Sequence, residues 1–307
     1  MTTTIEWVGL PDVLGCGWCQ RSDLSKQQLK QCGGCGAVRY CSKACQRTAW
    51  PYHKSTCRSN SSETVTGAEQ AGYTAPLSLA NAVKLWANTH EDAFSTVVHT
   101  IVRSRGGVDW VLSNERCIVF YLRPLAHYAD NPATAFEVTS LMLVSRDADL
   151  GDEHADEPFR DLWEEPLRAS RAQDAAQIVR TDPNPRFAGL LPATFMVADT
   201  EVVLHSHYAL YRPEDHDDGA PLPERVEAAF YDLQRLCVRA IAVGLVLRNP
   251  TDGSFPQVGY MLQERKKWVW KPMKNPLGLM AMTQDADDRP RRSKLSLREL
   301  WKLWRQW

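Results

Sequence analysis

The chain beyond residue 76 alternates between helical and extended patterns of hydrophobic residues. Apolar side chains recur every three or four positions from 79 to 101 and predict an amphipathic helix: Leu79, Val83, Trp86, Phe94, Val97 and Ile101. The apolar runs CIVFYL at 117–122 and FEVTSLMLV at 136–144 then predict two strands. This part of the chain is therefore expected to form a helix followed by a pair of strands.

The same order of patterns returns twice more along the chain. A weak helical pattern near 166–180 and a strong one at 226–241 are each followed by two extended segments. These segments are TFMVAD and VVLHSHYALY after the first helix, and GYMLQ and KWVWK after the second. The uneven spacing argues against a sequence repeat. We therefore predict a single α+β domain over residues 77–307, built on a largely antiparallel sheet.

Two further apolar stretches lie near the carboxyl end. The run VRAIAVGLVL at 238–247 is too short to span a membrane and is expected to be a buried helix. The tail KLSLRELWKLWRQW places four apolar side chains on one helical stripe, namely Leu297, Leu300, Trp301 and Trp304. A stripe of this kind predicts a helix that closes the domain's own core, and a docking surface for a partner or a membrane is the alternative.

Residues 58–76, RSNSSETVTGAEQAGYTAP, are small and polar and carry no hydrophobic periodicity. A segment of this composition is typical of a flexible linker. It separates the predicted α+β domain from an amino-terminal domain at residues 1–57.

The bulk composition is that of an ordinary globular protein. The chain has 307 residues, of which 44% are hydrophobic and 24% charged, and its formal net charge is −1. This balance gives no overall attraction to nucleic acid or to a membrane. The amino terminus MTTTIEWVGLPDVLG lacks the features of a secretory signal, so an intracellular location, nuclear or cytoplasmic, is expected. Cysteines in a reducing compartment favour metal binding over disulfides.

Seven of the nine cysteines crowd into residues 16–57 together with one histidine. The other two, Cys117 and Cys237, lie in apolar patterns and are predicted to be buried hydrophobes. The eight candidate ligands form four pairs: Cys16 and Cys19, Cys32 and Cys35, Cys41 and Cys45, and His53 and Cys57. Two such pairs complete the tetrahedron that zinc prefers, so the spacing predicts two zinc ions with closed, structural coordination. Spacing alone does not choose between a sequential and a cross-braced arrangement.

The pattern resembles the MYND zinc finger. The resemblance rests on the ligand pairs and on intervening residues that match the family: Tyr40, Ser42, Gln46, Trp50 and Lys54. It implies that the pairs alternate between metals. One zinc ion would then be held by Cys16, Cys19, Cys41 and Cys45, and the other by Cys32, Cys35, His53 and Cys57.

The resemblance also implies a groove that binds short proline-containing segments of protein partners. Gln46 and Trp50 match the C-Q-x3-W part of the family pattern. Trp50 is a suitable anchor because an indole gives a large apolar contact with little loss of side-chain entropy. Gln46 is placed to hydrogen-bond an extended peptide. The alternatives are that Trp50 packs the finger's own small core and that Gln46 is a solvated helix residue.

A second hypothesis is that the finger binds nucleic acid in transcriptional regulation. Basic residues outnumber acidic ones around the ligands, and Lys43, Arg47 and Lys54 are candidates for phosphate contacts. Thiolates and zinc ions leave the loaded finger with a charge of only roughly +2, which is weak for binding driven by phosphates. The finger is therefore expected to act through protein partners.

An enzymatic role is the third hypothesis, and it is the least favoured. MYND modules also occur in SET-domain lysine methyltransferases, but those carry an N-H-S-C-like motif after the finger and part of the catalytic domain before it, and neither is found here. The remaining chain shows none of the common hydrolase, nucleotide-binding or deaminase motifs. His205 and His207 share one face of a predicted strand, where a metal or proton-transfer site is conceivable, but a solvated face is expected. We therefore predict a protein without catalytic residues.

Overall fold

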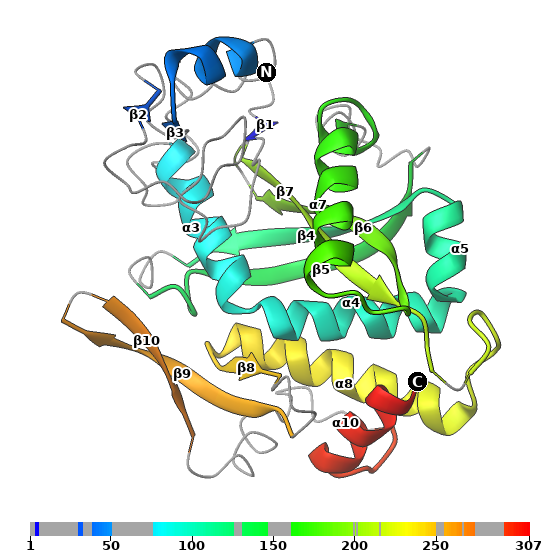
Figure 1. The fold of residues 1–307 in the computed structure, drawn as a ribbon. Helices are drawn as coiled ribbons and strands as arrows, with labels where there is room; N and C mark the ends of the chain where they lie inside the picture. The colour runs from blue at the N-terminus through cyan, green and yellow to red at the C-terminus, as the bar shows by residue number, and fades with distance from the viewer. Residues whose placement is uncertain are drawn as a thin grey trace.

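The computed structural model shows an α+β domain and part of an amino-terminal finger (Figure 1). It describes residues 4–5, 30–32, 39–50, 76–125, 131–146, 161–198, 200, 202–214, 216–249, 255–265, 267–273 and 292–307. The predicted start of the α+β domain at residue 77 lies next to the start of the first long helix, α3 (Pro76–Thr89), and the predicted boundary at residue 57 lies outside the described residues.

The centre of the domain is a five-stranded sheet in the order β1-β7-β6-β4-β5. Its strands are β1 (Thr4–Ile5), β4 (Arg116–Pro124), β5 (Phe136–Ser145), β6 (Phe187–Val197) and β7 (Val203–Tyr211). The neighbours β4 and β5 are antiparallel, as are β6 and β7, whereas β4 pairs with β6 and β1 with β7 in parallel. The α+β class is confirmed, and the large sheet is mixed rather than largely antiparallel.

The mixed topology follows from the path of the chain between β5 and β6. The last residue of β5, Ser145, lies opposite the first residue of β4, Arg116. The chain then passes through η1 (Asp161–Trp163) and α7 (Leu167–Thr181), and α7 lies over the sheet (Figure 1). Because β6 begins at the end of the sheet where β4 begins, it enters parallel to β4. The sequence pattern predicted the strands but carried no signal for their direction.

The first predicted helix is broken in the middle. The structure has α3 up to Thr89, α4 (Glu91–Arg105) from the next residue but one, and then a short α5 (Gly107–Ser113). His90 lies at the break with its ring fully buried, and its Nε2 donates a hydrogen bond to the carbonyl oxygen of Ala133 at 2.9 Å. The turn at His90 keeps the apolar faces of both helices directed at the core, which explains why the pattern reads as one helix.

A second, antiparallel sheet follows α8 (Glu224–Ala242). It contains β8 (Val246–Arg248), β9 (Gln257–Glu264) and β10 (Lys267–Pro272), in the order β10-β9-β8. The prediction of a single buried helix over 238–247 is therefore wrong in its second half. The helix ends at Ala242 because Gly244 has a φ of +71°, a left-handed conformation that glycine adopts without strain.

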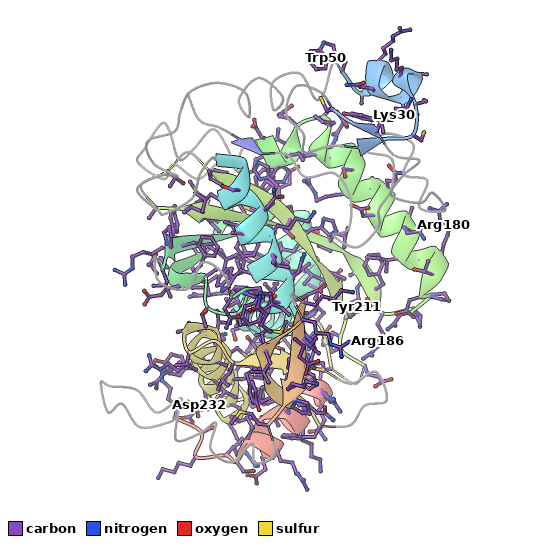
Figure 2. The ribbon with its side chains drawn as sticks, turned by 90° about the vertical axis from the view of Figure 1, so that its left-hand side faces the viewer. Lys30, Trp50, Arg180, Arg186, Tyr211 and Asp232 are labelled. Carbon is purple, nitrogen blue, oxygen red and sulfur yellow. The ribbon has the colours of Figure 1, made fainter. Side chains whose placement is uncertain are left out.

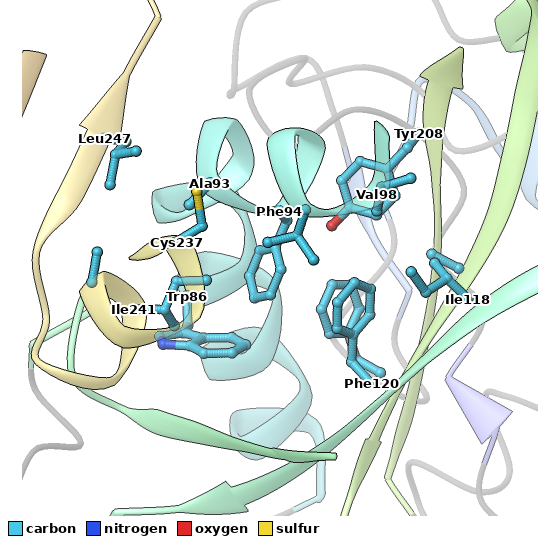
Figure 3. Packing of buried hydrophobic residues seen from close by; sticks show 14 of the residues in the cluster. Trp86, Ala93, Phe94, Val98, Ile118, Phe120, Tyr208, Cys237, Ile241 and Leu247 are labelled. Carbon is cyan, nitrogen blue, oxygen red and sulfur yellow. The ribbon is translucent and has the colours of Figure 1, made fainter. Parts of the chain in front are cut away.

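Helices α3, α4 and α8 cover one face of the five-stranded sheet and form the main core with it. Phe120 of β4 and Phe195 of β6 stack with their ring centroids 4.7 Å apart, and Phe94 of α4 meets both rings edge-on. Figure 3 shows Phe94 and Phe120 between the strands and α8, with Trp86 of α3 in the same cluster. Trp86 has no exposed surface in the structure.

The tail forms α10 (Leu297–Gln306), which packs against α8. Ser296 caps its amino terminus, and Glu299 reaches back to the cap residue in a complete capping box. Leu297, Leu300 and Trp301 are buried in the main core. The prediction that this stripe closes the domain's own core is thereby confirmed. None of the helices in the described ranges is both long and apolar enough to cross a bilayer.

The burial of Trp301 makes α10 a structural element whose loss is measurable. Trp301→Ala is expected to lower the free energy of unfolding of the α+β domain by about 3 to 5 kcal/mol, because it leaves a cavity under the helix. The exposed neighbour Lys302 is the matched control, and Lys302→Ala should change the free energy by less than about 0.5 kcal/mol. Urea unfolding followed by circular dichroism measures both, and equal stability of the two variants would contradict this packing.

The buried ring of His90 predicts a loss of stability in acid. Burial lowers the pKa of His90 from its ordinary value of 6.5 to about 4, although its hydrogen bond to Ala133 works in the other direction. Between these values the unfolded chain binds a proton that the folded chain does not. The free energy of unfolding should thus fall with falling pH, by on the order of 1 kcal/mol per pH unit from this residue.

The variant His90→Gln isolates this contribution. Glutamine keeps a donor for the Ala133 carbonyl but does not titrate, so the variant should show a shallower dependence on pH than the wild type. Urea unfolding between about pH 7 and pH 5 gives both slopes. Identical slopes would mean that His90 titrates with the same pKa in the folded and unfolded states.

Candidate zinc centre and binding surface

A short ladder of two strands positions the candidate ligands of the finger. β2 (Lys30–Gln31) and β3 (Arg39–Tyr40) are antiparallel, with Gln31 opposite Arg39. Cys32 follows β2 and Cys41 follows β3, so the two cysteines leave the ladder at opposite ends, about 10 Å apart along the strands. Two ligands of one zinc ion lie much closer than this. The cross-braced and the sequential arrangement both place Cys32 and Cys41 on different ions, and the ladder fits each.

The helical turn after β3 brings Cys41 and Cys45 together. Ser42 caps helical residues 43–50, since its Oγ accepts a hydrogen bond from the backbone N–H of Cys45 at 3.1 Å. The Sγ atoms of Cys41 and Cys45 lie 3.5 Å apart. Tetrahedral zinc with bonds of about 2.3 Å separates two sulfur ligands by roughly 3.8 Å. This pair therefore has the geometry of two ligands on one ion.

Gln46 contacts the second group of ligands. Its side-chain Nε2 donates to the Sγ of Cys32 at 3.6 Å, and Cys32 is 3% exposed. Gln46 follows Cys45 directly, so the helix that carries one candidate zinc pair also supports a ligand of the other ion. A hydrogen bond of this kind orients a thiolate ligand and adjusts its basicity. The alternative of a freely solvated Gln46 does not describe this side chain.

Trp50 lies at the end of the same helix and remains accessible. It is 39% exposed, whereas Tyr40 and Ala49 are 2% and 4% exposed and lie in the interior of the finger. Figure 2 shows the Trp50 side chain beyond the end of the helix, away from the α+β domain. The indole therefore offers part of its surface to a ligand, and peptide contact by Trp50 stays a prediction.

The remaining predicted ligands lie outside the described residues. These are Cys16, Cys19, Cys35, His53 and Cys57. Within the described part of the chain, no group of three or more histidine, cysteine or acidic side chains is placed to hold a metal. Cys117 and Cys237 are fully buried, and burial raises the pKa of the Cys117 thiol to about 12 and that of Cys237 further. Both behave as the buried hydrophobes that the sequence predicted.

The structure corrects the expectation for the paired histidines on β7. His205 and His207 do face the same side of the sheet, but this side lies under α7 rather than in solvent. His205 is 4% exposed, and its Nδ1 lies 3.3 Å from the Oγ1 of Thr194 on β6. Burial, reinforced by the nearby Arg171, lowers the pKa of His205 to about 3 and that of His207 to about 4. The sequence predicted the weak helix at 166–180 but not that it covers these histidines, because its inward side carries the polar residues Arg171 and Asp174.

Comparison with known families identifies the finger. Residues 16–57 match the family model described as the MYND finger. The chain therefore carries a MYND zinc finger at its amino-terminal end, as the ligand spacing predicted, and MYND fingers bind two structural zinc ions. Such fingers are typically modules for protein interaction.

Two curated relatives are similar to this chain over a short segment. Histone-lysine N-methyltransferase SMYD3 of Homo sapiens is 45% identical over 40 residues, which are 13% of this chain and 9% of that protein. SET domain and MYND-type zinc finger protein 6 of Schizosaccharomyces pombe is 38% identical over 40 residues, 13% of this chain and 8% of that protein. The chain thus spans about a tenth or less of the length of these relatives. No solved structure matches the chain.

The contact between Gln46 and Cys32 generates a prediction about metal affinity. Gln46→Leu removes the donor to the thiolate and should weaken zinc binding about 10- to 100-fold. The exposed neighbour Arg47 provides the control, and Arg47→Leu should bind zinc as the wild type does. Competition of the full-length protein with a chromophoric chelator measures both affinities. Wild-type affinity in Gln46→Leu would show that the contact does not support the ligand.

Proposed function

We propose that this protein is a non-enzymatic, zinc-dependent adaptor whose finger recruits protein partners through short proline-containing segments. The observation that carries the proposal is the exposed indole of Trp50 on a helix whose other end is fixed by Cys41 and Cys45. A rigid aromatic side chain binds a proline ring with little loss of entropy. The α+β domain then contributes a second binding or scaffolding role.

The surroundings of Trp50 suit an extended peptide. Gln46 lies one helical turn before it, and with the amide nitrogen engaged by Cys32, its Oε1 remains as an acceptor for a peptide N–H. The two bound zinc ions would hold this helix in place before the partner arrives. Such preorganisation raises affinity because less order is lost on binding.

The finger's charge supports a protein partner more than a nucleic acid. Lys43 and Arg47 are exposed and lie one turn apart on the helix, so a limited contact with phosphates is the competing function. The loaded finger carries only roughly +2, which provides little of the counterion release that drives binding to nucleic acid. Nuclear and cytoplasmic locations both suit the proposal, since free thiolates require a reducing compartment.

The methyltransferase activity in the printed names of the relatives is not carried over to this chain. The matched segment of 40 residues is about as long as the finger and amounts to 9% of SMYD3. A shared finger transfers no catalytic residues, because function depends on the site and not on the module that accompanies it. The proposal therefore assigns no catalytic residue to the chain.

The proposal predicts that binding depends on Trp50. The zinc-loaded, full-length protein should bind members of a library of proline-containing peptides at both low and high salt, and Trp50→Ala should weaken the tightest of them by about 30-fold, the effect of a typical interface anchor. Trp110 of α5, which is 36% exposed, is the matched control, and Trp110→Ala should bind as the wild type does. Fluorescence anisotropy with labelled peptides gives the affinities.

Duplex DNA in the same assay tests the competing function. Binding to DNA that disappears at high salt and in Lys43→Ala and Arg47→Ala, without any binding to peptides, would overturn the adaptor proposal. A peptide affinity that is equal in Trp50→Ala and in the wild type would contradict the role of the indole.

A further inference from the structure

The sheet face opposite the main core is covered by α7, and the contact layer between them is polar in its middle. The inward side of α7 carries Leu167, Arg171, Asp174 and Ile178, which recur at helical intervals and are all buried or half-buried. Figure 2 shows α7, the helix that carries the labelled Arg180, lying along the strands. An inward stripe on a helix is ordinarily apolar throughout. This one presents a guanidinium and a carboxylate between its two apolar ends.

The strands beneath supply polar side chains at matching positions. Thr194 on β6 lies directly opposite His205 on β7, and His207 lies opposite Pro192. Cys117, on the neighbouring strand β4, belongs to the small apolar cluster at the same face, together with Leu167. The guanidinium of Arg171 acts electrostatically on Cys117, His205 and His207. Side chains of two strands, β4 and β7, therefore lie within the electrostatic reach of one cation.

The guanidinium of Arg171 is attracted electrostatically by the carboxylate of Glu165, but Glu165 forms its ion pair with Arg168, at 3.1 Å. No hydrogen bond or ion pair joins its guanidinium to a described residue, and Asp174 instead lies 3.9 Å from the Nε2 of His207. The contrast is Arg103, which is buried and pairs with Asp218 at 3.2 Å, whereas Arg171 is half-buried. Buried charges in proteins are normally paired, because removing an isolated ion from water is costly. Within the described ranges, the layer thus holds a half-buried positive charge that forms no ion pair.

His205 supplies a second donor without an acceptor. Its ring is neutral and carries one proton. If the hydroxyl of Thr194 donates to Nδ1, both groups are satisfied and the proton resides on Nε2. In the opposite tautomer the proton resides on Nδ1. The hydroxyl hydrogen of Thr194 then has no acceptor, in addition to the unmatched Nε2. In the described part of the chain, the buried Nε2 has no partner, so it is an unmatched N–H donor within the layer.

We propose that the layer between α7 and the sheet is a binding site for an oxyanion, a carboxylate or phosphate group, held by Arg171 and by the Nε2–H of His205. A guanidinium binds such groups with two parallel hydrogen bonds, and a neutral imidazole adds one donor. Both unmatched donors are then satisfied by one ligand. This site lies apart from the finger and is independent of the peptide-binding proposal.

The layer is open to solvent on the side of His207 and Asp174. Their side chains are 26% and 23% exposed, whereas His205 behind them is closed off. Burial raises the pKa of Asp174. A ligand enters past this pair and places its oxyanion at the inner end, and the rest of the ligand extends towards the opening.

Thermal unfolding of the zinc-loaded, full-length protein tests the site. Once binding begins to saturate, each tenfold increase in sodium phosphate or sodium acetate should raise the Tm of the α+β domain by about 3 to 5 °C above sodium chloride of matched ionic strength. A response to phosphate alone identifies a phosphate ligand, and a response to acetate identifies a carboxylate ligand. No response to either anion would overturn the proposal.

Two variants separate binding from the general stabilising effect of such salts. Arg171→Met removes the unpaired charge, so it should retain or raise the Tm without ligand and lose the specific increase with phosphate or acetate. Arg168, on the same helix and 69% exposed, is the matched control, and Arg168→Gln should respond as the wild type does. The same increase in Arg171→Met as in the wild type would contradict the site.

A titration of the wild type by NMR covers the case in which Arg171→Met fails to fold. The Cε1–H signal of His205, assigned by its loss in His205→Gln, should shift and saturate with phosphate or acetate, while the signal of the distant His90 stays constant. An unchanged His205 signal, or a shift of His90 by the same amount, would overturn the proposal.

Discussion

The parallel pairing of β4 with β6 is the constraint on which the rest of the domain depends. These two strands lie in the interior of the five-stranded sheet, and parallel strands are stable only where both of their faces are covered. One cover is the layer of α3, α4 and α8, and the other is α7. The covers differ in kind. The first buries stacked aromatic rings such as Phe120 and Phe195, whereas the second buries apolar residues around a polar centre.

This asymmetry separates stability from binding within one domain. Removing water from apolar surface is favourable by about 25 cal/mol per Å², so the aromatic face supplies most of the free energy that holds the sheet and helices together. The polar face has fewer apolar contacts and holds neutral histidines and an unpaired guanidinium at a net cost. A fold tolerates such a layer when the stable face compensates for it, and polar groups kept at a cost are typical of functional sites.

Much of this architecture could be predicted from hydrophobic periodicity, and the failures have identifiable physical causes. All six predicted strands exist, and so do the predicted helices, except that the first is broken at His90 and the run at 238–247 is helical only as far as Ala242. The first half of β6 was missed since Gly189 and Pro192 are unfavourable in strands, and the end of α8 was missed since Gly244 interrupts an unbroken apolar run. Strand direction and the burial of His205 depend on α7, whose inward stripe is too polar to read as a core helix.

The finger is stabilised by metal ligands at characteristic intervals, whereas the site in the α+β domain is assembled by tertiary structure. The chemistry of the finger could therefore be recognised from spacing, and that of the domain could not. A segment of about forty residues has too small a core to fold unaided, so its ligands must recur at intervals that suit a metal. The spacing of the ligands can therefore be recognised from the sequence alone. A site between a helix and a sheet imposes no such intervals, because Arg171 and His205 are brought near each other only by the topology of the domain.

The zinc ligands fix one short helix, and with it the position of Trp50, without any contribution from the larger fold. The two surfaces can therefore act on separate ligands, and a change in one domain need not disturb the other.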